Sequence, residues 1–241
     1  MNLKRFERHF LLPKYDEESQ KLIFKSSVIV IGAGGLGSPA IIYLAANGIG
    51  KLGIVDFDTI DITNLNRQIL YDINDINNDK VSVAREKIAK INPDVQIESF
   101  KLKLNNDNIR DIIKDYDFVI DAVDNIETKL LINDACVELR KPFNHAGINN
   151  YAGSTITVIP EKSACLRCIF KNFKKDSSKS AVFGPIPGIL GIIQAAEALK
   201  YCGKFGNLLT NKFLFIDLYS MQFRITQIQR DENCYLCGGV R

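Results

Sequence analysis

The sequence predicts an α/β protein with a Rossmann-like mixed sheet, parallel in its first half and extended by antiparallel strands in its second half. Two observations lead to this prediction. In the first 140 or so residues, short buried β runs alternate with helical stretches, the order typical of a doubly wound parallel sheet. After Phe143 the alternation ends and longer strand-like segments follow. No linker interrupts the chain, so we expect a single domain over residues 1–241.

Glycine and proline residues mark the ends of the expected elements in the first half. Gly48 and Gly50 end the second expected element, and Asn92 precedes a proline, which disfavours helix at that position. The expected elements are, in chain order, strand Val28–Gly32, helix Leu36–Asn47, strand Leu52–Asp56, helix Asp79–Ile91, strand Val95–Lys101, short helix Asp107–Lys114, strand Phe118–Asp121 and helix Ile126–Leu139.

The second half differs in the length of its β segments. We expect antiparallel strands at Tyr151–Pro160, Lys212–Leu218 and Gln222–Gln229, with a helix near Ile186–Tyr201 between the first two. The Lys- and Ser-rich stretch Lys171–Gly184 is the expected mobile loop. A plain solvated loop without a role is the alternative for this stretch.

Composition excludes several classes of function. The chain has 241 residues, 46% of them hydrophobic and 24% charged, as in ordinary globular proteins. A net charge of +3 gives no reason to expect DNA or a membrane surface as partner. The segment "MNLKRFERHF" lacks the apolar core of a signal peptide, and Ile41–Ala46 is too short to span a bilayer. We therefore expect a cytoplasmic protein.

A glycine-rich turn lies between the first expected strand and helix. Gly32, Gly34 and Gly37 in "GAGGLG" match the G-x-G-x-x-G pattern, in which backbone N–H groups and a helix N-terminus face a phosphate. Asp56 ends the next strand, where a carboxylate can accept hydrogen bonds from ribose hydroxyls. These residues predict an adenine nucleotide, and they fit NAD and ATP equally well.

The polar residues that follow favour ATP. Asp58 is followed by Asn64, Asn66 and Arg67, and Lys80 opens the next helix. A guanidinium and an ammonium suit a triphosphate, whose negative charge grows on the leaving pyrophosphate. Each charge taken alone could instead be an ordinary surface residue.

The segment "DAVDN" lies at the end of the fourth expected strand, Phe118–Asp121. Asp124 lies at the edge of the sheet where ligands bind in such folds, and its carboxylate could hold Mg²⁺ against phosphates. Asp124 and Asn125 could also simply cap the helix that follows.

Four of the six cysteines form two CxxC pairs, Cys165/Cys168 and Cys234/Cys237. Two such pairs are typical of a closed, tetrahedral Cys₄ zinc site with a structural role. A redox CxxC and disulfides are the alternatives. Cys136 and Cys202 lie in helical patterns and are expected in the core.

Nearly the whole chain, from about Arg5 to Gly238, resembles the HesA/MoeB/ThiF family of adenylyltransferases, which activate ubiquitin-like sulfur-carrier proteins. The motifs that carry the resemblance are "RFERHF", "GAGGLGS", "VDFDTIDITNLNRQ", Lys80, "DAVDN" and the two CxxC pairs.

The resemblance implies roles for individual residues. Asp56 would bind the ATP ribose, and the backbone around Gly35 would contact the nucleotide. Asn64, Arg67 and Lys80 would act on the triphosphate and Asp124 on the magnesium. The full set expected to bind ATP is Gly32, Gly34, Gly35, Gly37, Asp56, Asp58, Asn64, Arg67, Gln68, Lys80, Asp124 and Asn125.

The family's chemistry predicts the partners. The substrate would be the C-terminal glycine carboxylate of a small β-grasp carrier ending in Gly-Gly, which attacks the ATP α-phosphate to give an acyl-adenylate and pyrophosphate. Arg8 matches an arginine that reaches the partner subunit's site, which implies a homodimer. Lys171–Gly184 contains no cysteine, and no rhodanese-like domain follows Arg241, so we expect a separate sulfurtransferase to supply any sulfur.

Three alternatives stay open at this point. An NAD-dependent oxidoreductase would explain the glycine turn and Asp56, but not Arg67, Lys80 or Asp124. A non-catalytic partner subunit should lack nucleotide ligands, whereas every matched position is filled here. Branches of the family that adenylylate a peptide or a tRNA share the same motifs. The pathway also stays open among molybdopterin, thiamin, tRNA thiolation and protein modification.

Overall fold

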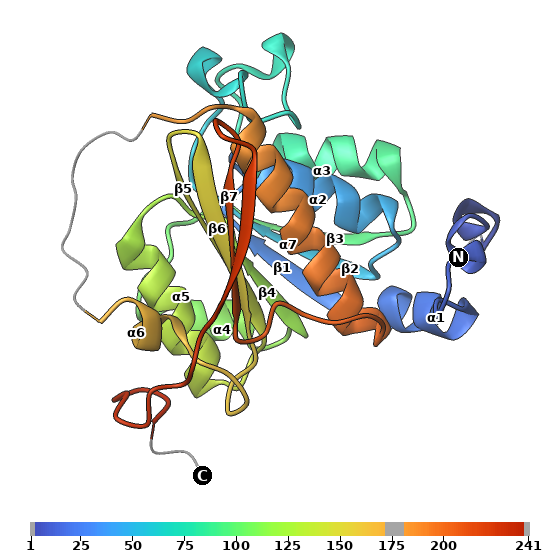
Figure 1. Cartoon of the computed structure of the whole chain (residues 1–241). Helices are drawn as coiled ribbons and strands as arrows, with labels where there is room; N and C mark the ends of the chain where they lie inside the picture. Colours follow the sequence, from blue (N-terminus) through green and yellow to red (C-terminus); the bar gives the residue numbers. More distant parts are fainter. Residues whose placement is uncertain (1–2, 172–180, 239–241) are drawn as a thin grey trace.

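The computed structural model describes residues 3–171 and 181–238 of the chain. It contains one eight-stranded sheet in the order β3-β2-β1-β4-β5-β6-β7-β8 (Figure 1). The first five strands are parallel and the last three join antiparallel, as the sequence predicts. The strands are β1 (Ser27–Ile31), β2 (Lys51–Val55), β3 (Gln96–Phe100), β4 (Phe118–Asp121), β5 (Phe143–Asn149), β6 (Ala152–Val158), β7 (Lys212–Asp217) and β8 (Gln222–Gln227).

Helices cover both faces of the sheet, which gives three layers (Figure 1). The α-helices are α1 (Glu17–Lys25), α2 (Gly37–Ala46), α3 (Lys80–Ile91), α4 (Ile109–Ile113), α5 (Ile126–Glu138), α6 (Leu166–Ile169) and α7 (Pro185–Gly203). The apolar core is divided in the same way. One buried cluster joins the sheet to α2, α3 and α7, and the other joins it to α4, α5 and α6.

Short 3₁₀ turns complete the chain: η1 (Leu3–Phe6), η2 (His9–Leu11), η3 (Ile62–Asn64) and η4 (Ile73–Asp75). The last two lie in the long connection between β2 and α3, drawn in cyan and teal at the top of Figure 1. Aspartates begin both of them, because the Asp61 and Asp72 side chains accept backbone N–H groups two residues on.

Among the α-helices and strands, three were not predicted. Helix α1 begins at an N-cap, Asp16, whose carboxylate accepts the Ser19 N–H, and two glutamates follow in its first turn. Strand β5 was missed because two of its buried residues, Asn144 and His145, are polar. The third is the single turn α6.

The remaining predictions differ from the structure by at most two residues at element ends, as is usual for helix and strand boundaries. Most of the expected mobile loop, residues 172–180 of Lys171–Gly184, lies outside the described residues. Within the described residues, no helix combines the length and apolar character needed to cross a bilayer.

Candidate functional site

The glycine turn between β1 and α2 is shaped by close packing at its two ends. Gly32 has φ +96°, and a Cβ there would lie 2.6 Å from the Ala122 carbonyl oxygen. A Cβ on Gly37 would lie 1.9 Å from the Gly32 carbonyl oxygen. At Gly34, by contrast, the nearest atom to a Cβ is the Gln68 amide nitrogen at 3.6 Å, an ordinary contact. Packing therefore explains the outer glycines but not Gly34, where the open backbone leaves space for an approaching group.

Asp56 fastens this turn to the end of β2. Its Oδ2 accepts the Ala33 N–H at 2.7 Å and its Oδ1 accepts the Asp58 N–H at 2.9 Å. Burial raises the pKa of this carboxyl, while the nearby Lys80 ammonium and the two N–H donors act against that rise. A carboxylate held by backbone donors in this way has a fixed direction and keeps acceptor capacity for a hydroxyl.

Lys80 is the first residue of α3 and only 4% exposed. Its Nζ lies 3.0 Å from Asp58 Oδ2, on a carboxylate that is half exposed. The interpretation of Lys80 as a surface charge is therefore wrong. Because its carboxylate partner faces solvent, the buried Lys80 ammonium can also contact an anion that binds from the solvent side.

The "NLNRQ" segment lies against the glycine turn. The Arg67 Cγ is 3.4 Å from the position of a Cβ on Gly35. Arg67 Nη1 donates to the Thr63 carbonyl and to Asn66 Oδ1, both at 2.9 Å. Asn64 Oδ1 accepts the Asp61 N–H at 3.2 Å. The structure thus brings this predicted run to the same end of the sheet as Asp56 and Lys80.

Gln68 has an unusual hydrogen-bond deficit. Its side chain is 5% exposed, and its Oε1 is buried without a hydrogen-bond partner among the described residues. Buried amide oxygens are rarely left in this state, so an additional donor is expected beside the glycine turn.

The "DAVDN" turn adjoins the same place, because Gly32 packs on the backbone of Ala122. Asp124 is exposed. Asn125 is the N-cap of α5, and its Oδ1 accepts the Thr128 N–H at 2.9 Å. The capping alternative therefore holds for Asn125, whereas no hydrogen bond from Asp124 to a described residue is present.

Arg8 lies away from this group. Phe6 packs on Gly48, just beyond the last residue of α2, and Arg5 donates to the Ile91 carbonyl at the end of α3. The glycine turn and Lys80 are at the opposite ends of these two helices. A ten-residue helix is about 15 Å long, so Arg8 does not reach the site of its own chain.

Tyr71 is a site residue that sequence analysis missed. Its buried hydroxyl donates to the Ala33 carbonyl at 2.9 Å, and it also lies 3.3 Å from the Lys80 carbonyl. One side chain thereby links the glycine turn to the start of α3. A tyrosine gives no sequence signal for such a role, since the contact with Ala33 spans 38 residues.

The four cysteines predicted to bind metal come together at the other end of the molecule. The Sγ atoms are 3.9 Å apart for Cys165 and Cys168, 3.7 Å for Cys165 and Cys234, and 3.4 Å for Cys168 and Cys237. All four lie within 4.8 Å of one another. Tetrahedral zinc with Zn–S bonds of about 2.3 Å requires sulfurs about 3.8 Å apart. The donor set therefore fits Zn²⁺.

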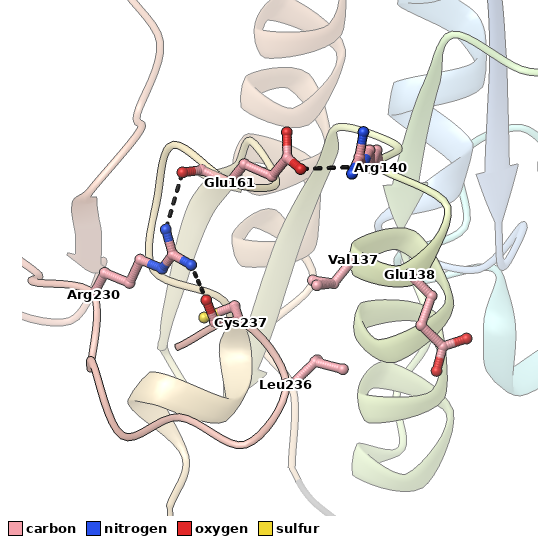
Figure 2. Close-up of a pocket in the computed structure, with 7 residues that line it drawn as sticks. All are labelled: Val137, Glu138, Arg140, Glu161, Arg230, Leu236 and Cys237. Carbon is pink, nitrogen blue, oxygen red and sulfur yellow. Dashed lines mark hydrogen bonds and ion pairs between the residues drawn. The ribbon is translucent and has the colours of Figure 1, made fainter. Parts of the chain in front are cut away.

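A small pocket lies beside this cysteine cluster, between the end of α5 and the C-terminal segment (Figure 2). Arg230 donates to the carbonyls of Glu161 and Cys237, and Arg140 pairs with Glu161 at 3.0 Å. These contacts tie the C-terminal segment to the body of the protein. The pocket contains none of the residues of the nucleotide motifs.

Comparisons with known proteins agree with this arrangement. The model of the ThiF family matches residues 6–236. The sulfur carrier protein adenylyltransferase of Thermus thermophilus is 35% identical, covering 98% of this chain and 91% of its own length. A probable molybdopterin-synthase adenylyltransferase of Porphyra purpurea is 39% identical over 91% of this chain, which spans 59% of that protein. The crystal structure of E. coli MccB with ATP matches with a TM-score of 0.90 and 25% identity, covering 99% of this chain and 75% of that one.

Proposed function

The chain belongs to the ThiF family, and we propose that it uses ATP to adenylylate the C-terminal glycine carboxylate of a small ubiquitin-like sulfur-carrier protein. The observation that carries the proposal is the meeting of the glycine turn, Asp56 and the buried Lys80 at one end of the parallel sheet. An NAD-binding enzyme would leave Arg67, Lys80 and Asp124 together unexplained. The relative from Thermus thermophilus, which matches this chain over almost its full length, is named as an adenylyltransferase.

The residues present fit ATP in three respects. Asp56 is oriented to accept from ribose hydroxyls, and Lys80 and Arg67 offer cationic groups to the phosphates. The unpaired Oε1 of Gln68 fits a donor such as a ribose hydroxyl or the adenine amine. Asp124, exposed on the turn after β4, would be the residue that holds Mg²⁺.

The reaction needs no nucleophile from the protein. A carboxylate oxygen of the carrier forms a bond to the α-phosphorus, the bond between that phosphorus and the bridging oxygen breaks, and pyrophosphate leaves with the electron pair. Lys80 and Arg67 stabilise the charge that accumulates on the leaving group, and Asp56 holds the ribose so that the α-phosphate faces the carboxylate. Mg²⁺, when bound, supplies further positive charge to the phosphates.

The positions of the cysteines support adenylation without a thioester. All six cysteines are buried, four in the cluster that we propose binds structural Zn²⁺ and the other two, Cys136 and Cys202, in the apolar core. None is placed to attack an acyl-adenylate. We therefore infer that sulfur is supplied by a separate sulfurtransferase.

A surface for the carrier protein is available on the antiparallel part of the sheet. Helix α7 packs on β4, β5 and β6, and Ile216 of β7 is buried in the same apolar cluster, whereas β8 is exposed along its whole length. Phe223 and Ile225 lie opposite Ile216 and Leu214 in the register, and they are 56% and 58% exposed. An apolar sheet face of this kind suits a small folded protein whose tail enters the nucleotide end.

The distance of Arg8 from its own site supports a homodimer in which each subunit completes the other's site. Two inactive variants test this arrangement. Arg8→Ala and Arg67→Ala, each inactive alone, should regain about a quarter of wild-type activity after unfolding and refolding as a mixture, because half of the dimers then contain one complete site. Mixtures that stay inactive would contradict shared sites without affecting the proposed reaction.

ATP–pyrophosphate exchange tests the reaction itself. With Mg²⁺ and candidate carriers ending in Gly-Gly, added one at a time, exchange should depend on one carrier and be lost when its terminal glycine is deleted. Arg67→Ala should lower the exchange rate about 10²- to 10³-fold. Arg85→Ala, which removes an exposed arginine on α3, is the matched control and should leave the rate unchanged.

A different outcome would redirect the proposal. Exchange that no carrier supports but that short peptides or tRNA support would place the chain in another adenylylating branch. Tight binding of NAD by the folded protein, with no exchange under any condition, would refute adenylation.

A further inference from the structure

Three ionisable side chains are buried together where β4, β5 and α5 meet, next to the proposed nucleotide end. They are Asp121, Lys129 and His145, which are 0%, 7% and 2% exposed. None of the three was assigned a role in the reaction. A buried carboxylate, ammonium and imidazole are costly to desolvate, and packed apolar residues would serve stability as well or better. A role in the adjacent nucleotide site would explain why these three residues are buried there.

Asp121 is the last residue of β4, and it shapes the turn that carries Asp124. Its Oδ1 accepts the Val123 N–H at 3.3 Å, so the side chain folds the backbone of the turn onto itself. Its main-chain carbonyl accepts an N–H of Gln194 from α7 at 2.8 Å. Asp124 has no contact of this kind with a described residue, so its direction depends on the backbone that Asp121 holds.

Lys129 and His145 hold Asp121 from two other elements. Lys129, in α5, lies 3.4 Å from Asp121 Oδ1 and donates to the Ala146 carbonyl of β5 at 2.6 Å. His145 Nδ1 lies 2.6 Å from Asp121 Oδ2. The carboxylate thus has a partner on each oxygen. Strand β5 is joined to Asp121 directly by His145 and indirectly by Lys129, which contacts both Asp121 and the Ala146 carbonyl.

The charges of the cluster balance only when the imidazole is neutral. The Lys129 ammonium leads the effects that hold the pKa of Asp121 below its usual range against burial, so the carboxylate is ionised. Burial lowers the pKa of His145 despite the adjoining carboxylate. A neutral ring that donates to Asp121 carries its proton on Nδ1.

We propose that His145, through its Nδ1–H bond to Asp121, is a positioning residue that holds the turn 121–125 so that Asp124 can bind the magnesium of Mg·ATP. This inference rests on the proposed function, in which Asp124 serves the metal. His145 itself touches neither ATP nor metal. It acts as outer-shell partners of metal ligands do, by fixing the direction of a ligand through a buried hydrogen bond.

An isosteric pair of substitutions separates this role from a purely structural one. His145→Asn keeps an N–H close to the place of Nδ1. His145→Leu has nearly the same shape as His145→Asn but offers no hydrogen-bond donor. The affinity of the enzyme–ATP complex for Mn²⁺, measured by electron paramagnetic resonance, should fall about tenfold or more in His145→Leu. It should stay within about threefold of wild type in His145→Asn.

Thermal unfolding of both variants shows that they are folded at the temperature of the titration. Wild-type Mn²⁺ affinity in a folded His145→Leu would overturn the proposal, and so would an equal loss in both variants. The metal titration needs no carrier, so failure to bind ATP at all would refute the proposed function rather than this inference.

A measurement on the wild-type protein covers the case in which His145→Leu does not fold. The chain has only two histidines, His9 and His145, so ¹⁵N-labelled imidazole signals can be assigned with a His9→Gln variant. The His145 ring should be neutral with its proton on Nδ1, and its signals should shift when Mg·ATP is added and not when ATP is added with a chelator. A ring protonated on Nε2, or signals indifferent to the metal, would contradict the proposal.

Discussion

The two ends of this molecule show how differently the proposed zinc site and the proposed nucleotide site are built. At the cysteine end, four sulfurs face one another with the spacing of a tetrahedron. At the nucleotide end, Asp56 and Lys80 are already engaged by the protein, Asp56 by two N–H donors and Lys80 by Asp58. The cysteine end therefore identifies its ligand by geometry, whereas the nucleotide end does so only by the kinds of groups that it assembles.

The difference has an energetic side. A metal held by four thiolates contributes directly to folding, because no such site exists in the unfolded chain. A buried lysine at a ligand site contributes little or costs stability, because desolvation of the ammonium offsets its ion pair. We therefore expect substitutions at the cysteine end to affect folding and substitutions at the nucleotide end to affect activity.

The largest effect should follow from opening the cysteine cluster. Cys168→Ser should lose bound zinc and a large part of the stability of the fold, since zinc contributes on the order of 10 kcal/mol to small zinc domains. Metal analysis and thermal unfolding with and without a chelator measure both consequences. Cys136→Ser, which changes a buried thiol outside the cluster, is the control and should retain its zinc. Full stability of zinc-free protein would remove the structural role.

The second prediction concerns the buried lysine at the opposite end. Lys80→Met keeps the volume and removes the charge, so we expect stability to be unchanged or slightly higher and ATP–pyrophosphate exchange to fall about 10²- to 10³-fold. Lys87→Met, on the same helix with partners Asp72 and Asp75, should keep the exchange rate. A strongly destabilised Lys80→Met with a normal exchange rate would contradict this prediction, because Lys80 would then serve folding rather than activity.

The residues that sequence analysis found and missed follow the same division. The glycine turn, Asp56 and the CxxC pairs were predictable because short sequence motifs with fixed spacing identify them. Tyr71 and His145 were not, because their roles consist of contacts across 38 and 24 residues. The two polar residues that hid β5 have partners from other elements: Asn144 bonds to Thr155 and Thr157 of β6, and His145 bonds to Asp121 of β4. Such pairing permits burial but leaves no hydrophobic pattern in the sequence.

The smallest predicted effect is a change in pH dependence at Asp56. Burial is the main cause of the raised pKa of this carboxyl, so between the ordinary value of 3.8 and the raised value the folded protein binds more protons than the unfolded chain. The contribution of Asp56 to stability is then present at the acidic end of that window and lost as pH rises through it. Asp56→Asn removes this titration.

Chemical unfolding at a series of pH values from about 3.5 to 7 would show the effect as a difference in slope, at about 1.4 kcal/mol for each unit of pKa shift. The free energy of unfolding of Asp56→Asn should decline less, or rise more, with pH than that of wild type across the window. Asp107→Asn, at an exposed position before α4, shows what the loss of an exposed carboxylate does. Parallel curves for wild type and Asp56→Asn would mean that Asp56 is as well solvated as an exposed carboxylate. The nucleotide end would then lack the desolvation cost that the raised pKa of Asp56 implies.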